Sequence, residues 1–133
     1  MANQVLCGIH VAATAEALAL ATRAGADPNV VYEVLGSGAA SSFVWQSRVP
    51  NIIKGDYSPR GVVDIFKKDL GIALDAARAL DMPVPLAAVT LQQFLAAAAL
   101  GYQRADDAAV VKVYEQLAGI DIAASAGKSG RRD

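Results

Sequence analysis

Alanine is the feature that most constrains this chain, because it supplies 28 of the 133 residues. Alanine has the highest intrinsic helix propensity and is depleted in β-strands. Apolar residues recur every three to four positions, and no run alternates apolar and polar residues for long enough to predict a sheet. The sequence therefore predicts an all-α protein of about six helices with a long central first helix.

Composition and charge limit the possible functions. Hydrophobic residues make up 54% of the chain and charged residues 19%, which is typical of one folded domain with a buried core. The net charge of −1 argues against a nucleic-acid partner. A single Cys7 excludes an intrachain disulfide, and with a single His10 the chain lacks a Cys/His zinc set, so we expect no metal. We interpret His10 and Cys7 as packed structural residues.

The expected first helix, over residues 2–24, is apolar enough to raise the question of a membrane span. Much of it is Ala, Gly and Thr, which partition weakly into lipid, and Glu16 interrupts it. It also lacks the basic start and the cleavage pattern of a signal peptide. We expect a buried core helix in a cytoplasmic protein, with no membrane partner.

Capping residues, glycines and prolines divide the rest of the chain into five further helices. Asp27 and Pro28 start the second, and Ser41 or Ser42 caps a third that Pro50 ends or interrupts. The fourth and fifth are expected over 62–80 and 85–100, and Asp106 or Asp107 caps a sixth with four inward-facing residues. These expectations define a helical domain over 1–122 and a flexible tail over 123–133. The apolar stripe of the fourth helix is Phe66, Leu70, Ala73, Ala77 and Leu80, and the inner residues of the sixth are Val110, Val113, Tyr114 and Leu117.

Two polar features leave their roles open. A semi-polar stripe on the first helix faces either a partner helix or a cleft. Lys68 lies about 200° around the fourth helix from Phe66, so we expect it to be exposed. It belongs either to a solvated face, where it would pair with Asp64 at i,i+4, or to a binding site. The semi-polar stripe consists of Asn3, Cys7, His10 and Thr14.

Five short motifs occur in an order that resembles a known family. They are Asn3-Gln4, Glu16-Ala17-Leu18, residues 23–28, residues 36–42, and Lys68-Asp69-Leu70 with residues 73–76. From about residue 3 to residue 117 the chain resembles the C-terminal helical domain of the β-hydroxyacid dehydrogenases, the family of 3-hydroxyisobutyrate dehydrogenase. The resemblance implies a fold like that of the C-terminal domain of 6-phosphogluconate dehydrogenase, a distant relative.

The resemblance also implies a function. Family members transfer a hydride between NAD or NADP and a short β-hydroxy acid. Their N-terminal Rossmann domain binds most of the cofactor, and this chain has no Gly-x-Gly-x-x-Gly fingerprint. The catalytic lysine of the family precedes an Asn-Gln pair and would fall just before Met1, so we expect no catalytic residue in this chain. By resemblance, Asn3 and Gln4 bind the substrate, Lys68 contacts the cofactor, and Asp69 supports the helix or the cleft.

One departure and two expectations complete the comparison with the family. Asp106-Asp107-Ala108-Ala109 stands where the family often has Asp-His-Ser-Ala, so a role for that histidine is unsupported. We expect the isolated chain to be inactive and to form a homo-oligomer through its apolar first and fifth helices. The alternative function is a stand-alone helical interaction module that dimerises through an apolar face.

Overall fold

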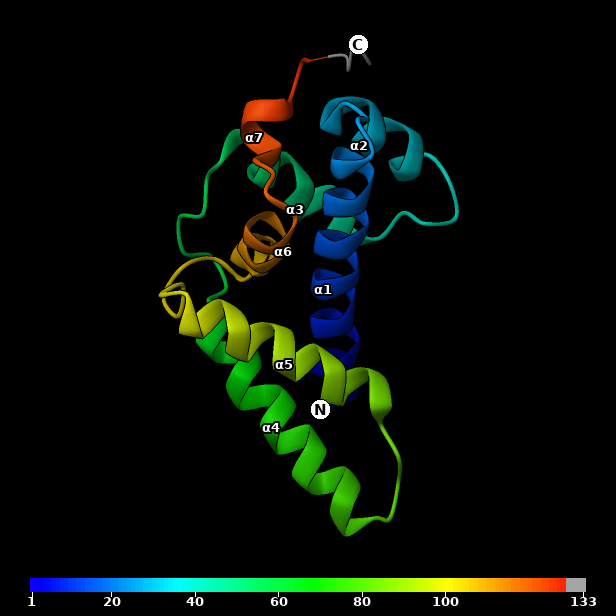
Figure 1. Cartoon of the computed structure of the whole chain (residues 1–133). Coiled ribbons are helices and arrows are strands. Elements are labelled where there is room, and N and C mark those ends of the chain that lie inside the picture. The colour runs from blue at the N-terminus through cyan, green and yellow to red at the C-terminus, as the bar shows by residue number, and fades with distance from the viewer. Residues whose placement is uncertain (129–133) are drawn as a thin grey trace.

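Helix α1 (Ala2–Arg23) runs through the middle of the computed structural model and contacts every other described helix (Figure 1). The structure describes residues 1–128. Within them no strand forms, and the all-α prediction is confirmed. The remaining helices are α2 (Pro28–Gly36), α3 (Phe43–Lys54), α4 (Val63–Ala79), α5 (Pro85–Ala99), the 3₁₀-helix η1 (Asp107–Val110), α6 (Val111–Ala118) and α7 (Ile122–Ser125).

The residues that α1 buries explain its central place. Leu18 is fully buried, and small residues such as Ala15 and Gly8 let neighbouring helices approach. Leu6 and Leu20 remain exposed, so α1 is not covered on all sides. Of the described helices, α1 is the one long and apolar enough to cross a membrane, a property that the core helix of a soluble protein shares.

The caps resolve the alternatives that the sequence left open. Ser42, and not Ser41, caps α3 by accepting a hydrogen bond from the backbone N–H of Trp45 at 2.9 Å. Asp106, and not Asp107, accepts from the N–H of Ala108 at the start of η1. Pro50 lies inside α3, which continues for another turn before it ends at Lys54.

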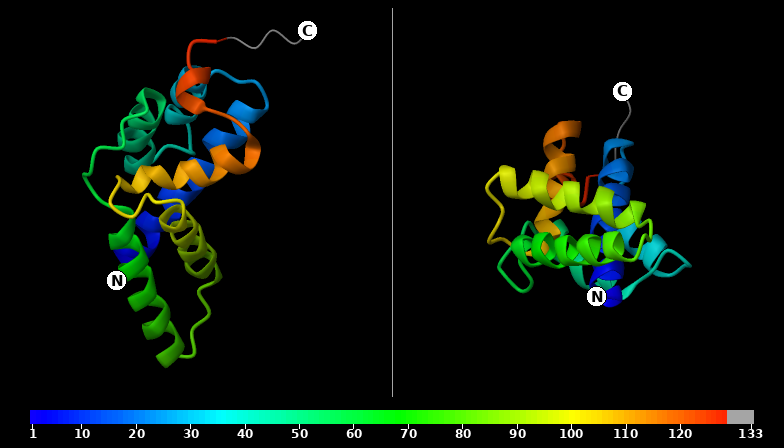
Figure 2. Two further views of the ribbon diagram at one scale, coloured as in Figure 1. Left: turned by 60° about the vertical axis from the view of Figure 1, so that its left-hand side comes forward. Right: turned by 90° about the horizontal axis from the view of Figure 1, so that it is seen from below.

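Helices α4 and α5 form an antiparallel hairpin that projects from the body of the molecule (Figures 1 and 2). The rings of Phe66 and Phe94 stack between them, with their centroids 5.0 Å apart. The expected stripe of α4 is buried as far as Ala77. Leu80 is exposed because it lies beyond the last residue of α4. The prediction that Leu80 belongs to the buried stripe was therefore wrong.

The inner face of α6 differs from the expected one. Leu117 is 81% exposed, whereas Glu115 is buried and accepts hydrogen bonds from the N–H of Ile122 at 2.9 Å and from Lys112 at 2.6 Å. Val111 and Glu115 are four residues apart on the buried face of α6, whereas Leu117 lies in the last turn of the helix. The prediction of Leu117 as an inner residue was therefore wrong.

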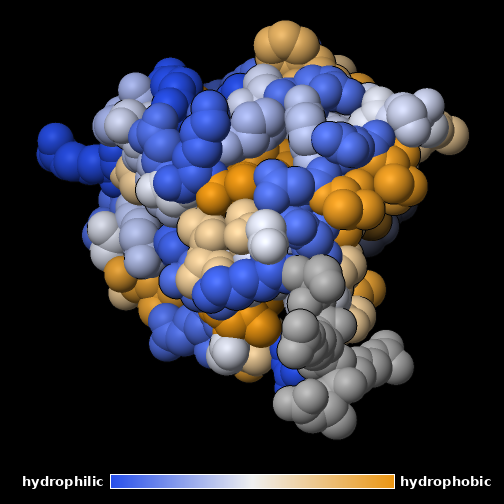
Figure 3. Space-filling model, turned by 90° about the horizontal axis from the view of Figure 1, so that it is seen from above, coloured by the Kyte–Doolittle hydropathy of each residue, from blue (hydrophilic) through white to orange (hydrophobic). Residues whose placement is uncertain are grey.

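The C-terminal segment is held to the body as far as it is described. Ile122 is fully buried at the start of α7, and the N–H of Gly127 donates to the carboxylate of Asp27 at 3.1 Å. Helix α7 therefore extends into the range 123–133 that the sequence assigned to a tail. Residues 129–133 of that range lie outside the described residues. Polar side chains with apolar ones between them cover the end of the molecule where α2 and α7 lie (Figure 3).

Candidate functional site

The first turn of α1 meets the middle of α4 at a hydrogen bond between side chains. Nε2 of Gln4 donates to Oδ2 of Asp69 at 2.7 Å. The two helices come this close because Gly8 has no side chain. A Cβ there would lie 3.1 Å from Cδ1 of Phe66 and 3.4 Å from the methyl groups of Leu70, which is tight for an unstrained contact.

Asn3 extends this contact toward solvent. Its Nδ2 donates to Oε1 of Gln4 at 2.9 Å and lies 3.6 Å from the sulfur of Cys7. The side chain is exposed, and its Oδ1 accepts no hydrogen bond from the residues that the structure describes. Asn3 therefore keeps an open acceptor at the surface.

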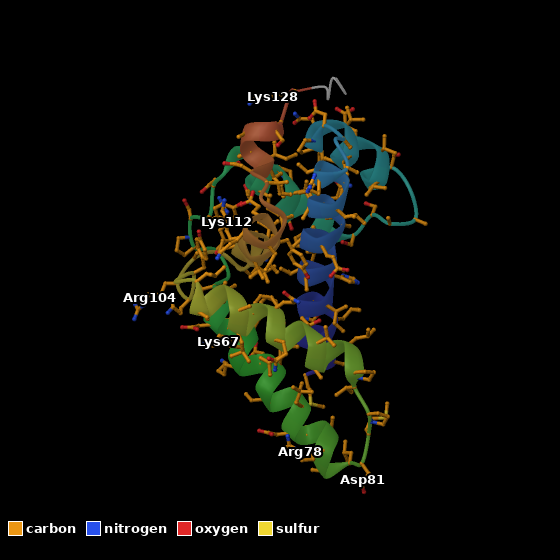
Figure 4. All side chains as sticks on the ribbon, in the orientation of Figure 1. Lys67, Arg78, Asp81, Arg104, Lys112 and Lys128 are labelled. Carbon is orange, nitrogen blue, oxygen red and sulfur yellow. The ribbon has the colours of Figure 1, made fainter. Side chains whose placement is uncertain are left out.

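Lys68 lies on the same side of the cluster. Its side chain is 68% exposed, which confirms the prediction from its angle on the helix, and Nζ is 3.5 Å from Oδ1 of Asp69. The expected pair between Asp64 and Lys68 was wrong, because Asp64 bonds Lys67 at 2.7 Å instead. Lys67 is labelled in Figure 4.

Asp69 is the residue that joins these groups. It is only 19% exposed, and one oxygen takes the hydrogen bond from Gln4 while the other faces Lys68. Asn3, Gln4, Asp69 and Lys68 thus form one continuous chain of polar contacts, which we call the polar cluster. The structure brings together all three residues that the family resemblance assigned to binding.

A second charged contact lies deeper, and no local sequence pattern predicts it. Nε and Nη2 of Arg48 each donate to a carboxylate oxygen of Asp107 at 2.8 Å. Asp107 is 1% exposed. Burial raises the pKa of Asp107, and the hydrogen bonds from Arg48 lower it only in part. Asp107 in turn raises the pKa of Arg48.

Arg48 and Asp107 lie 59 positions apart, which is why spacing alone could not pair them. Gly61 leaves room for the carboxylate, since a Cβ there would lie 3.1 Å from Oδ2 of Asp107. The pair joins α3 to η1 at the place where the chain departs from the family pattern. We assign it a structural role.

The semi-polar stripe of α1 divides between two surroundings. Asn3 and Cys7 belong to the side of the polar cluster, whereas His10 and Thr14 line a separate cavity farther along the helix. In residues 1–128 no group of three or more His, Cys, Asp or Glu side chains is placed to hold a metal ion.

Comparisons with known proteins identify the family of the chain. Residues 1–114 match the family model described as NAD-binding of NADP-dependent 3-hydroxyisobutyrate dehydrogenase. The chain is 48% identical to an L-threonate dehydrogenase of Cupriavidus necator over 112 residues, which are 84% of this chain and 38% of that protein. It is 34% identical to a 2-(hydroxymethyl)glutarate dehydrogenase of Eubacterium barkeri, over 90% of this chain and 40% of that one.

A solved structure gives the same result. The crystal structure of a 3-hydroxyisobutyrate dehydrogenase from Salmonella typhimurium superposes with a TM-score of 0.82 at 47% identity, and covers 84% of this chain and 39% of that one. The chain therefore spans about two fifths of the length of the relatives that it matches.

Proposed function

The chain belongs to the family of NADP-dependent 3-hydroxyisobutyrate dehydrogenase, and from that premise we propose that it is the substrate-side helical domain of an NAD(P)-dependent β-hydroxyacid dehydrogenase. The observation that carries the proposal is the polar cluster. It presents an exposed amide and an exposed ammonium group on adjacent helices, joined through Asp69. This is a set of groups suited to a small anionic, hydroxyl-bearing substrate beside a negatively charged cofactor.

Each residue of the polar cluster has a distinct part in the proposal. Asn3 hydrogen-bonds the hydroxyl or the carboxylate of the substrate, because its Oδ1 is open and its side chain reaches solvent. Gln4 contributes to substrate binding chiefly by placing Asn3, since its amide nitrogen donates to Asp69 and its amide oxygen accepts from Asn3. Asp69 holds Lys68 near the position where the substrate would lie.

The residues present can contact a nicotinamide cofactor but cannot form its whole binding site. The ammonium of Lys68 can meet a cofactor phosphate or the acid, and Asp69 leaves it largely exposed to do so. Residues 1–128 contain neither a strand nor a glycine fingerprint, so they do not supply a pyrophosphate site. The bound cofactor would supply or accept the hydride.

The test measures hydride transfer by the product of the complete reading frame, with L-threonate and 3-hydroxyisobutyrate as first substrates. Lys68→Ala should lower kcat/KM by roughly tenfold or more, mainly through KM, because one charge contact is lost. Lys67→Ala is the matched control, since Lys67 pairs with Asp64 and not with Asp69, and it should change kcat/KM by less than about twofold.

Other results would refute the proposal. A protein that transfers no hydride with any short β-hydroxy acid contradicts it, as does an equal loss in the two lysine variants. The reading frame upstream of Met1 gives an independent check. A preceding dinucleotide-binding domain is expected, and its absence would favour the stand-alone interaction module.

We also propose that the helical domain forms a homo-oligomer through α5. No residue from Pro85 to Ala99 is charged, and Leu86 and Val89 remain more than 60% exposed. The charged residues of the hairpin lie on α4 and in the turn that follows it. Arg78 of α4 and Asp81 of the turn, for example, lie at the tip of the hairpin (Figure 4). A helix without charge on its exposed face is typical of one that packs against another surface.

A further inference from the structure

The structural pair with Asp107 uses only part of the Arg48 guanidinium group. Nε and Nη2 donate to the two carboxylate oxygens at 2.8 Å, and Nη1 donates to Oγ of Ser47 at 3.2 Å. A guanidinium group has five N–H bonds, so two of them, one on Nη1 and one on Nη2, make no hydrogen bond to the residues that the structure describes. These two lie side by side at the end of the planar group, in the geometry that binds both oxygens of a carboxylate.

The free end of Arg48 can be reached from outside the molecule. Its side chain is 22% exposed, whereas that of Asp107 is 1% exposed. The buried carboxylate therefore holds one edge of the guanidinium group in place and leaves the end of the group open. A cation that is fixed before it binds loses little conformational freedom on binding, which favours a specific contact with an anion.

Two close approaches place Arg48 beside the start of α4 and near the first turns of α1. A Cβ at Gly61, two residues before α4, would lie 3.9 Å from Nη2 of Arg48. One turn into α4, Phe66 lies against Gly8 of α1, the residue that follows Cys7. The guanidinium group of α3 thus lies where the start of α4 meets the first turns of α1.

Cys7 links this position to the polar cluster. Asp107 is the main cause of the raised pKa of Arg48, but Cys7 contributes to it as well, so its sulfur lies within electrostatic range of the guanidinium group. The same sulfur is 3.6 Å from Nδ2 of Asn3. Asn3 is four residues before Cys7, which is about 6 Å along the helix. A short hydroxy acid has a similar length, so its two ends can meet Asn3 and Arg48 at the same time.

We propose that Arg48 binds the carboxylate of the substrate while Asn3 meets its hydroxyl, an inference that rests on the proposed dehydrogenase function. Because Asp107 already balances the charge of the guanidinium group, Arg48 acts through two directed, charge-assisted hydrogen bonds rather than through net charge. Such a pair of bonds distinguishes a carboxylate from an uncharged amide. Arg48 is thus a specificity-determining residue that makes the protein prefer acids.

The test compares an acid with its amide as substrates of the product of the complete reading frame. L-threonate and 3-hydroxyisobutyrate are each assayed beside the corresponding amide, which has the same carbon skeleton without the charge. The unsubstituted protein should prefer the acid. Arg48→Gln/Asp107→Asn should reduce that preference, measured as the ratio of the two kcat/KM values, by about tenfold, mainly through KM for the acid. The double variant removes both charges of the pair, so no buried carboxylate is left without a cation.

Asp107→Asn alone is the matched control, because it disturbs the same pair but keeps the guanidinium group. It should change the preference for the acid by less than about twofold. A merely structural role for Arg48 would raise KM for the acid and for the amide alike and leave their ratio unchanged. If the double variant fails to fold by circular dichroism, Arg48→Lys keeps a cation beside Asp107 without the two parallel donors, and the preference should then fall about threefold or more.

Three results would count against these conclusions, and they are distinguishable. An unchanged ratio in the folded double variant would overturn the inference and leave the proposed function intact. An equal fall in Asp107→Asn and in the double variant would also overturn it, because the loss would then be due to the carboxylate of Asp107. The absence of hydride transfer with every acid would refute the proposed function, and the inference with it.

Discussion

Gln4 on α1 donates to Asp69 on α4 across 65 positions of sequence, at 2.7 Å. The other carboxylate oxygen of Asp69 lies 3.5 Å from Nζ of Lys68. The position of the lysine is thus tied to the first turn of a different helix through a single carboxylate. Asp69 is mostly shielded from water, so this link is stronger than a contact between two exposed side chains.

Replacement of Asp69 by alanine should therefore lower the free energy of unfolding by about 1 to 2 kcal/mol, the upper part of the range for one hydrogen bond. Urea denaturation followed by circular dichroism measures this change. Asp75→Ala is the control, because Asp75 pairs with Arg78 where both side chains are largely exposed, and it should cost less than about 0.5 kcal/mol. Equal losses in the two variants would contradict a special role for Asp69.

Arg48→Leu should be much more damaging. It leaves the carboxylate of Asp107 buried without its cation, and breaking such a pair costs about 3 to 5 kcal/mol. Thermal and urea unfolding both report the loss. The double variant Arg48→Leu/Asp107→Leu should recover most of it, since no uncompensated charge remains.

The cost of Arg48→Leu should also depend on pH. Burial raises the pKa of Asp107 above its unfolded value of 3.8, so its contribution to stability is fully present below that value and falls as pH rises through the folded pKa. Without Arg48 the folded pKa rises further. The deficit of the variant should thus be smaller near about pH 4 than near about pH 7, and unfolding at both values tests it. A larger deficit at the acidic value would show that the carboxylate is not the cause.

The purified 133-residue chain should transfer no hydride by itself. Its described residues lack a site for the cofactor pyrophosphate, and loss of cofactor binding alone costs orders of magnitude in rate. Absorbance at the wavelength of the reduced nicotinamide, with a blank that lacks the chain, is the measurement. Turnover of any β-hydroxy acid above that blank would prove the expectation wrong.

Light scattering should give the mass of a dimer or a larger assembly, with more than about 1,000 Å² buried between copies. Leu86→Glu and Val89→Glu place a charge on the exposed face of α5 and should shift the mass toward the monomer. Val30→Glu is the control, because Val30 is an exposed valine on α2 at the other end of the molecule. A monomer in the unsubstituted chain would remove the basis for an interface on α5.

Features with a local cause could be predicted from the sequence. The apolar period of α4 placed Phe66 inside and Lys68 outside, because both follow from one helical repeat. Asp27 and Pro28 marked the start of α2 through side-chain capping and a fixed φ angle. The residues of the candidate site came from the family resemblance, and their meeting at one place was seen only in the structure.

Features with a distant cause could not be predicted. The partner of Asp107 depends on how α3 packs against η1, and buried Glu115 accepts a hydrogen bond from the N–H of Ile122 at the start of α7. Asp64 pairs with Lys67 at i,i+3 and not with Lys68 at i,i+4. Helical spacing alone leaves the i,i+3 and i,i+4 partners of Asp64 equivalent, and it says nothing of contacts between different helices.

Gly8 has a consequence for motion. Since the backbone of α1 lies against the rings and methyl groups of α4 at that point, a slide of α1 by one residue would drive the side chain of Cys7 or Ile9 into Phe66. The close packing at Gly8 therefore prevents α1 and α4 from sliding along each other, so we expect the two helices to move as one rigid unit. Any movement that rotates α1 will therefore carry Asn3 and Lys68 together, so the spacing of the two groups is preserved.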